Sequence, residues 1–275
     1  MNLKAKNPKV SVVVAVYNRE AEIERFLKSV KNQSYENLEA VVVDDGSTDN
    51  TVAVSRKYTS KVFARKHTER SLQRNFGVKF STGKYVLVLD SDMILTTNVV
   101  RDCVRIAQSN GFKALIVPER SIGEGYWAKV KAFERSFYVG DETIEAARFF
   151  DKETFLKFGG YDTTLTGPED WDLPLRMRKF GLKIGRIGSY ILHDEGKLSL
   201  IKTLKKKFYY GRHAHGYAKR HPEMISSQGN LFFRPAFIRG WRRLLENLTL
   251  TLGLIIMRGF EMLAAATGFL YGLFN

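Results

Sequence analysis

Cysteine is almost missing from this 275-residue chain, since Cys103 is the only one. One cysteine cannot form an internal disulfide, which excludes the small secreted folds that disulfides stabilise and indicates a reducing compartment. Cys103 stands in an apolar stretch, so we expect it to be a small core residue. The first nine residues hold no apolar segment typical of a secretory signal, and we expect no cleaved leader.

Long uncharged hydrophobic runs are missing too. The two longest near the C-terminus, 247–257 and 262–275, are separated by Arg258 and Glu261. Each run is shorter than the roughly 20 residues that a transmembrane helix needs, and charges are costly at mid-membrane. With 44% hydrophobic and 27% charged residues, the chain is neither disordered nor a polytopic membrane protein.

Acidic residues are scarce between residues 197 and 245, where twelve Lys or Arg face a single acid, Glu223. This segment therefore carries +11 of the net charge of +15. Aromatic residues are interleaved with these cations, a composition that suits a membrane interface or RNA. The apolar runs that follow favour the membrane. We predict a peripheral, monotopic attachment, with a single spanning helix and a helical pair packed on the protein or on a second subunit as alternatives.

What the chain does have is an alternation of apolar strands and amphipathic helices. Apolar runs predict strands at residues 10–16, 38–43, 61–64, 84–89 and 114–117. A 3.6-residue periodicity predicts helices at residues 19–32, 71–80 and 97–108. This order is typical of an α/β fold with a mostly parallel, nucleotide-binding sheet.

Acidic side chains follow two of these predicted strands. Asp90 and Asp92 end one of them, and Asp44 and Asp45 end another. Ligands of open α/β sheets bind at the carboxyl ends of the strands. Two carboxylates one residue apart can hold a hard cation, which in turn can hold a diphosphate. Taken alone, this spacing is as typical of a solvated turn.

Six short motifs occur in an order that resembles the family 2 glycosyltransferases. They are VSVVVAVYN at 10–18, DDGSTDNT at 44–51, Arg74-Asn75 before Gly83-Lys84-Tyr85, LDSD at 89–92, GGYD at 159–162, and Glu169-Asp170. The resemblance covers residues 8 to 195 and implies inverting chemistry on a GT-A fold, a single Rossmann-like mixed, mostly parallel sheet flanked by helices. We expect a catalytic domain at 1–195, with a nucleotide half at about 8–118 and an acceptor half at about 119–195. A basic, aromatic and apolar helical extension would occupy 196–275.

The resemblance also assigns roles to residues of the nucleotide half. Ala15, Tyr17 and Asp45 match positions that hold the nucleoside base. Arg74 matches a basic position near the phosphates.

Asp90 and Asp92, with Ser91 between them in the donor site, match the pair that binds Mg²⁺ or Mn²⁺ at the donor diphosphate. His193 resembles a late histidine that completes the metal site in some relatives; a strand-end histidine bonded to backbone is the alternative.

Acceptor and catalytic roles follow in the same way. Asp170 matches the general base that deprotonates the acceptor hydroxyl, although Glu169 or Asp172 could equally be the acid that a helix N-terminus favours. Trp171 could stack on an acceptor sugar or pack in the core, and Arg148 could face a phosphate or solvent. Glu169, Trp171 and Arg148 are therefore acceptor-site candidates.

The implied function is transfer of a sugar from a UDP- or GDP-linked donor to a hydroxyl of a lipid-linked or polysaccharide acceptor. The reaction would take place at the cytoplasmic face of the cell membrane, in the synthesis of cell-envelope polysaccharide or glycan precursors. A nucleotide-sugar-binding protein without turnover, and a nucleic-acid-binding protein that uses the basic segment, are the rival classes. The number of subunits stays open, because a second copy could also cover the apolar tail.

Overall fold

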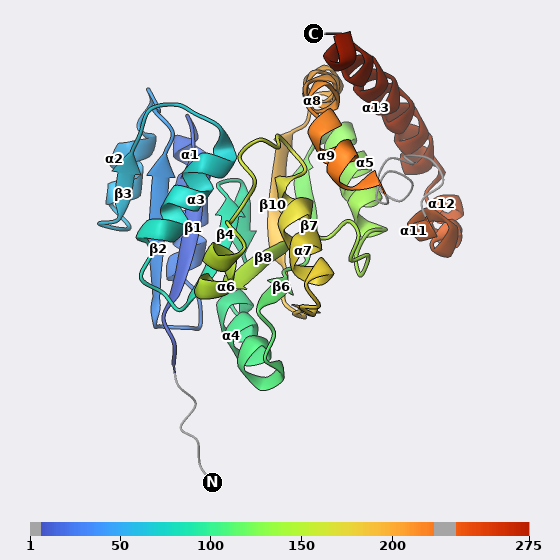
Figure 1. The fold of residues 1–275 in the computed structure, drawn as a ribbon. Helices are drawn as coiled ribbons and strands as arrows, with labels where there is room; N and C mark the ends of the chain where they lie inside the picture. Colours follow the sequence, from blue (N-terminus) through green and yellow to red (C-terminus); the bar gives the residue numbers. More distant parts are fainter. Residues whose placement is uncertain (1–6, 223–234, 275) are drawn as a thin grey trace. The chain divides into compact units, whose positions relative to one another are not determined.

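Seven strands form one mixed sheet in the order β3-β2-β1-β4-β8-β6-β9 (Figure 1). They are β3 (Val62–Ala64), β2 (Leu38–Asp44), β1 (Val10–Val16), β4 (Tyr85–Asp90), β8 (Ala147–Asp151), β6 (Ala114–Ile116) and β9 (Ile184–Arg186). β8 runs antiparallel to β4 and β6, and the other pairs are parallel. The computed structural model describes residues 7–222 and 235–274 and confirms the predicted mostly parallel α/β sheet.

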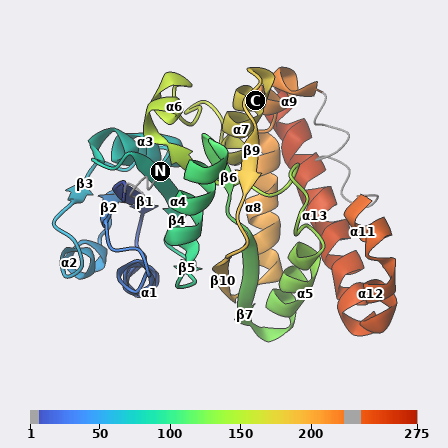
Figure 2. The ribbon, with the colours of Figure 1, turned by 90° about the horizontal axis from the view of Figure 1, so that it is seen from below.

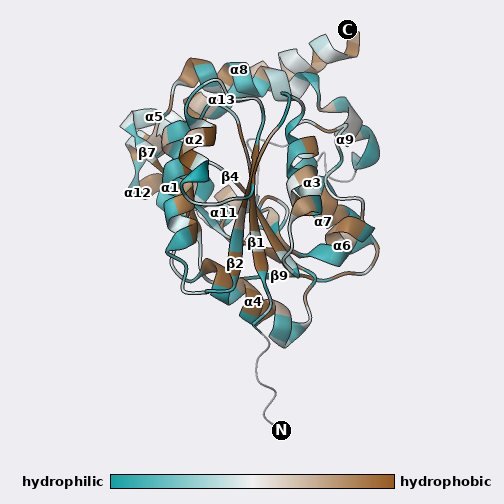
Figure 3. Ribbon diagram, turned by 90° about the vertical axis from the view of Figure 1, so that its left-hand side faces the viewer, coloured by the Kyte–Doolittle hydropathy of each residue, from teal (hydrophilic) through white to brown (hydrophobic). Residues whose placement is uncertain are grey.

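β1 is buried on both faces, as its unbroken run of apolar residues predicts. Val12 and Val14 join a core cluster with Ile23 and Phe26, whereas Val13 joins a separate cluster with Val78. Figure 3 shows the hydrophobic colour along the central strands. Helices therefore cover both faces of the sheet.

The helices of this sheet are amphipathic and short. They are α1 (Glu20–Lys31), α2 (Thr51–Arg56), α3 (Arg70–Phe80), α4 (Val99–Asn110), α6 (Lys152–Lys157) and α7 (Glu169–Lys179). Cys103 of α4 is fully buried in the core, as expected, and burial raises the pKa of its thiol.

Three strands form a second sheet, in the order β5-β10-β7. They are β5 (Met93–Leu95), β10 (Ile191–Lys197) and β7 (Glu119–Glu124). β5 and β7 were not predicted. β5 is only three residues long, and β7 reads Glu-Arg-Ser-Ile-Gly-Glu, which lacks the apolar run that identifies a strand in sequence.

The chain divides into two compact units, each described by itself. The first comprises the residues up to 118, 146–163 and 172–192, and the second comprises 119–145, 164–171 and the residues from 193 onward. The seven-stranded sheet belongs to the first unit. The domain boundary expected at residue 195 stays a prediction.

Most of the second unit is helical. Its helices are α5 (Gly125–Ser136), α8 (Leu200–Arg212), α9 (His215–Arg220), α11 (Pro235–Arg239), α12 (Trp241–Glu246) and α13 (Leu248–Phe274). Figures 1 and 2 both show α13 beside α8 and α5. The two apolar runs of the sequence form one continuous helix of 27 residues, long and apolar enough to cross a membrane by length and composition.

Candidate functional site

The carboxyl ends of β1, β2 and β4 bring the predicted nucleotide-site residues of the first unit together. In the parallel register, Ala15 of β1 lies opposite Asp90 of β4, and Val16 lies opposite Asp44 of β2. Tyr17 follows the end of β1 directly, and Asp45 follows the end of β2. This edge of the sheet therefore carries an aromatic ring and several carboxylates.

Asp45 and Tyr17 share a contact that sequence reasoning missed, the side chain of His67. The Nδ1 atom of His67 lies 2.7 Å from Oδ2 of Asp45. The rings of His67 and Tyr17 lie with their centroids 4.6 Å apart. His67 belongs to the connection between β3 and α3, and nothing in the sequence near it indicates a role beyond its place in a loop.

The other oxygen of Asp45 is held by the same connection. Thr68 donates its backbone N–H to Oδ1 at 2.8 Å, and Gln73 donates its side-chain amide to the same atom. Asp45 is only 7% exposed, whereas Tyr17 is 45% exposed. A fixed acceptor beside an exposed ring suits a flat heterocycle with N–H groups, such as a nucleobase.

The loop after β2 approaches the same connection closely. Asp44 accepts the backbone N–H groups of Gly46 and Ser47 through Oδ2, at 3.2 and 3.0 Å. Gly46 has a φ of +82°, and a Cβ there would lie 3.2 Å from the backbone nitrogen of His67. The Asp-Asp-Gly-Ser turn thus requires glycine for both its conformation and its packing.

Arg74 does not project into the open edge of the sheet. Its side chain is fully buried, pairs with Asp90 through Nη2, and lies 5.6 Å from the centre of the Tyr161 ring. We expected it near the donor phosphates. In the structure Arg74 contacts Asp90, and its role near the donor phosphates stays a prediction.

The surroundings of Asp90 favour the ionised form of its carboxyl group over the protonated form. Burial alone would raise its pKa, but the positive charges of Arg74, Arg70 and Arg148 outweigh burial and hold the pKa well below its usual range. Arg148 is itself buried, with 6% of its surface exposed, so the alternative in which it faces solvent is wrong.

The chemistry of this strand end fits a hard divalent cation. Asp90 is ionised, and Asp92 lies half-buried in the turn between β4 and β5. Over residues 7–222 and 235–274, no group of three or more His, Cys, Asp or Glu side chains could hold a metal ion. Mg²⁺ is commonly bound by one or two carboxylates, with substrate phosphates and water completing its shell. Asp90 and Asp92 match that kind of site.

Asp170 and its neighbours begin α7 in the second unit. Glu169 is fully buried and accepts the backbone N–H of Gly167 at 2.7 Å. Trp171 donates its indole N–H to the carbonyl of Ile144 at 2.9 Å. Asp170 is half-buried. Glu169 therefore has a local structural role, and the Trp171 indole N–H is bonded to backbone.

Asp172 is also engaged. It is 2% exposed, and its Oδ2 lies 2.7 Å from Nε of Arg176. Arg176 in turn donates to the carbonyl of Gly160 at 2.6 Å. Glu169 and Asp172 thus each have a defined contact within the protein, and the role of Asp170 as general base stays a prediction.

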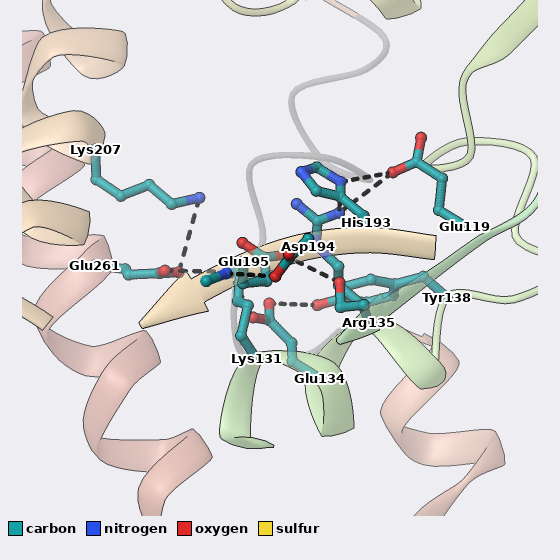
Figure 4. Close-up of polar contacts among 12 residues, drawn as sticks. Glu119, Lys131, Glu134, Arg135, Tyr138, His193, Asp194, Glu195, Lys207 and Glu261 are labelled. Atoms are coloured by element: carbon teal, nitrogen blue, oxygen red, sulfur yellow. Dashed lines mark hydrogen bonds and ion pairs between the residues drawn. The ribbon is translucent and has the colours of Figure 1, made fainter. Parts of the chain in front are cut away.

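His193 lies in a charged network of the second unit (Figure 4). Its Nδ1 atom is 3.1 Å from Oε2 of Glu119 and 2.8 Å from Nη1 of Arg135. Nε of Arg135 lies 3.3 Å from Oε1 of Glu195. The ring thus contacts the side chains of Glu119 and Arg135, and the metal-ligand role of His193 stays a prediction.

Comparison with known proteins decides the family. The sequence description of the glycosyl transferase family 2 matches residues 11–163, more than half of the 275-residue chain. This chain belongs to glycosyltransferase family 2. As a family 2 member it is a glycosyltransferase, and the resemblance seen in its six motifs is confirmed.

Two curated relatives of this chain are bacterial proteins. An uncharacterized glycosyltransferase of Haemophilus influenzae is 28% identical over 181 residues, which are 61% of this chain and 61% of that protein. A poly(ribitol-phosphate) beta-N-acetylglucosaminyltransferase of Staphylococcus aureus is 29% identical over 150 residues, 52% of this chain and 46% of that protein. The chain thus spans about half to three fifths of the length of these relatives.

A solved structure shares the fold. A mannosyltransferase from Pyrobaculum calidifontis, in complex with GDP-Man and Mn²⁺, superposes with a TM-score of 0.68 at 19% identity. The match covers 96% of this chain and 87% of that one.

Proposed function

We propose that this enzyme transfers a sugar, with inversion, from a nucleoside diphosphate donor to a hydroxyl of a lipid-linked or polysaccharide acceptor at a membrane surface. The main support is the meeting of Tyr17, Asp45 and Asp90 at one edge of the sheet. The GDP-Man and Mn²⁺ bound to the mannosyltransferase, and the poly(ribitol-phosphate) acceptor named for the Staphylococcus relative, support the classes of donor and acceptor.

In this proposal, the nucleobase binds to the first unit at the ends of β1 and β2. Tyr17 offers an exposed ring face, and Asp45 accepts a base N–H through Oδ2, the oxygen that faces His67. Oδ1 already accepts two hydrogen bonds, from Thr68 and Gln73, so it has little remaining capacity.

Asp90 and Asp92 would hold Mg²⁺ or Mn²⁺. The cation, when bound, supplies positive charge that stabilises the departing nucleoside diphosphate. Arg74 and Arg148 contribute indirectly, since their charges keep Asp90 ionised. His193 is a further candidate ligand, and Ser91 a further donor-site residue.

Asp170 would act as the general base. It would accept the proton of the acceptor hydroxyl, whose oxygen then attacks the anomeric carbon on the face opposite the leaving group. Its match to the general-base position of the family, and its half-buried place at the start of α7, support this choice of acid. Glu169, Trp171 and Arg148 stay acceptor-site candidates.

A screen of nucleotide sugars with Mn²⁺ or Mg²⁺, scored by release of nucleoside diphosphate, tests the proposal. We expect one donor class to be hydrolysed only with metal, and Asp92→Asn to abolish that release. Glu36→Gln, at an exposed acid in the connection between α1 and β2, is the matched control. If the protein bound the nucleotide sugar but released no nucleoside diphosphate with any acceptor or metal, a binding protein without turnover would be favoured instead.

A second arm of the screen addresses the nucleic-acid alternative. The proposal predicts that anionic liposomes bind more of the protein than RNA does, at equal salt. The opposite order would support a nucleic-acid-binding protein.

A further inference from the structure

α13 has two different faces. Its buried residues are Gly253, Leu254, Met257, Arg258, Glu261 and Gly268. Its large exposed residues are all apolar or aromatic: Leu248, Leu252, Ile255, Ile256, Phe260, Met262, Leu263, Leu270, Tyr271, Leu273 and Phe274. At 100° per residue most of these exposed positions fall on one side of the helix, opposite the buried ones.

The buried face of α13 packs on its neighbours along its whole length. Tyr126 lies in the first turn of α5, and a Cβ at Gly253 would lie 2.3 Å from its hydroxyl oxygen. Near the other end, a Cβ at Gly268 would lie 2.1 Å from the carbonyl oxygen of Phe208, and one at Gly272 would lie 2.3 Å from that of Arg212. Only glycine permits these approaches, so α8 and α13 are held at backbone contact.

Both charges of α13 have partners on neighbouring helices. Arg258 pairs with Glu134 of α5 and donates through Nη1 to the hydroxyl oxygen of Tyr138 at 3.0 Å. Glu261 lies 3.2 Å from Nζ of Lys131 on α5 and 3.7 Å from Nζ of Lys207 on α8 (Figure 4). These ion pairs hold the middle of α13 against the rest of the unit.

The helices that adjoin α13 carry exposed cations. On α8 they are Lys202, Lys205 and Lys206, and on α11 and α12 they are Arg239, Arg242 and Arg243. Trp241 and Leu245 of α12 are exposed as well, at 54% and 61%. An uncharged apolar stripe on α13, with cations and a tryptophan exposed on the adjoining helices, is complementary to an anionic bilayer surface.

We propose that α13 lies in the plane of an anionic phospholipid membrane and does not cross it. The exposed stripe of α13 enters the headgroup and acyl boundary, and the cations of α8, α11 and α12 contact lipid phosphate. This inference rests on the proposed function, because an enzyme that lies on the membrane surface can reach an acceptor held in that membrane.

Two observations oppose a spanning orientation. α8 is in backbone contact with α13 and carries Lys202, Lys205, Lys206, Lys207 and Arg212, which would have to enter the hydrocarbon with it. Separating α13 from the unit would instead break the ion pairs of Arg258 and Glu261 and place both charges at mid-membrane.

Vesicle flotation of the full chain tests the surface. We expect binding to vesicles of phosphatidylcholine with phosphatidylglycerol and weak binding to phosphatidylcholine alone. Leu263→Asp, in the middle of the stripe, should lower binding by about ten-fold or more. Leu156→Asp is the matched control, an exposed leucine of α6 in the other unit, and should bind as the parent does.

The orientation is tested with single cysteines at the two ends of the helix, Leu248→Cys and Leu273→Cys. Cys103 is fully buried, so the introduced thiol is the reactive one. With protein added to preformed vesicles, a helix in the membrane plane keeps both ends on the outer side, so a membrane-impermeant maleimide should label the two positions to the same extent. Protection of one end until detergent is added would show a spanning helix and overturn the proposal.

Two further outcomes would also overturn it. Absence of vesicle binding together with a dimer in light scattering would show that a second copy covers the stripe. Vesicle binding that Leu263→Asp leaves unchanged would place the contact elsewhere. Donor hydrolysis by Leu263→Asp, measured without lipid, should match the parent, so a failed membrane inference is distinguishable from a failed donor assignment.

Discussion

The two units bury charged side chains in similar pairs but with different consequences. In the first unit, fully buried Arg74 pairs with Asp90, whose side chain keeps 24% of its surface exposed. In the second, Arg258 pairs with Glu134, and the two side chains are 5% and 3% exposed. The first pair holds an ionised carboxylate at an open strand end, whereas the second holds two helices together.

Exposure, rather than the pairing itself, distinguishes the carboxylate proposed for chemistry from the one that stabilises the fold. Burial alone would raise the pKa of Glu134, but Lys131 and Arg258 hold it below its usual range, as arginines do for Asp90. Both carboxylates are therefore ionised at neutral pH. Only Asp90 can also reach a ligand.

Replacing Asp170 should give the largest effect. This residue belongs to the second unit, yet we propose it as the general base. We expect Asp170→Asn to lower the rate of sugar transfer by about 10³-fold, since a general base contributes roughly that much. Binding of the nucleoside diphosphate should change little. Steady-state kinetics and calorimetry measure the two effects, with Glu36→Gln as control. An unchanged rate would remove Asp170 from the mechanism.

Replacing Arg258 tests the structural side of the comparison. Arg258→Leu leaves Glu134 buried beside fewer positive charges, and loss of one partner of a buried ion pair costs about 3–5 kcal/mol. Urea unfolding should show a loss of that order. The matched variant Arg242→Leu, at an exposed position of α12, should stay within about 0.5 kcal/mol of the parent. Equal effects would contradict the assigned role of the pair.

Replacing Tyr17 tests the proposed nucleobase site of the first unit, with a smaller expected effect. Tyr17→Ala should weaken binding of the nucleoside diphosphate by about ten-fold, because stacking of a base on a ring contributes about 1–3 kcal/mol. Tyr17→Phe keeps the ring face and should bind within about two-fold of the parent. Isothermal titration calorimetry with the preferred nucleotide compares the three proteins, and equal affinities would place the base elsewhere.

Lys207 should give the smallest effect, on the pH dependence of stability. Burial first, and then the charge of Lys131, lower its pKa to about 8. The unfolded chain therefore holds a proton that the folded protein has released, and stability should rise between about pH 8 and 10. The gain is reduced because 34% of the side chain is exposed. Thermal melts of Lys207→Gln should lose this rise, and those of Lys202→Gln should keep it.

Local pattern predicted the first unit well and the second poorly. β1, β2 and β4 are continuous apolar runs, and Asp45, Asp90 and Asp92 follow such runs directly, so their meeting at one edge could be expected. His67 could not be predicted, because its contact with Asp45 joins residues 22 positions apart through a loop without pattern. β7 was missed for the related reason that its side chains are mostly polar.

By itself, the sequence determined the order of strands and helices, the family and the acids at the strand ends, because these depend on periodicity over a few neighbouring residues. Tertiary structure decided that Arg74 pairs with Asp90, that Asp172 pairs with Arg176, and that two apolar runs form one helix. Those outcomes depend on which distant side chains meet. Arg258 and Glu261 show the reason: in sequence they interrupt an apolar segment, whereas in the fold, Glu134 and Lys131 of α5 compensate their charges.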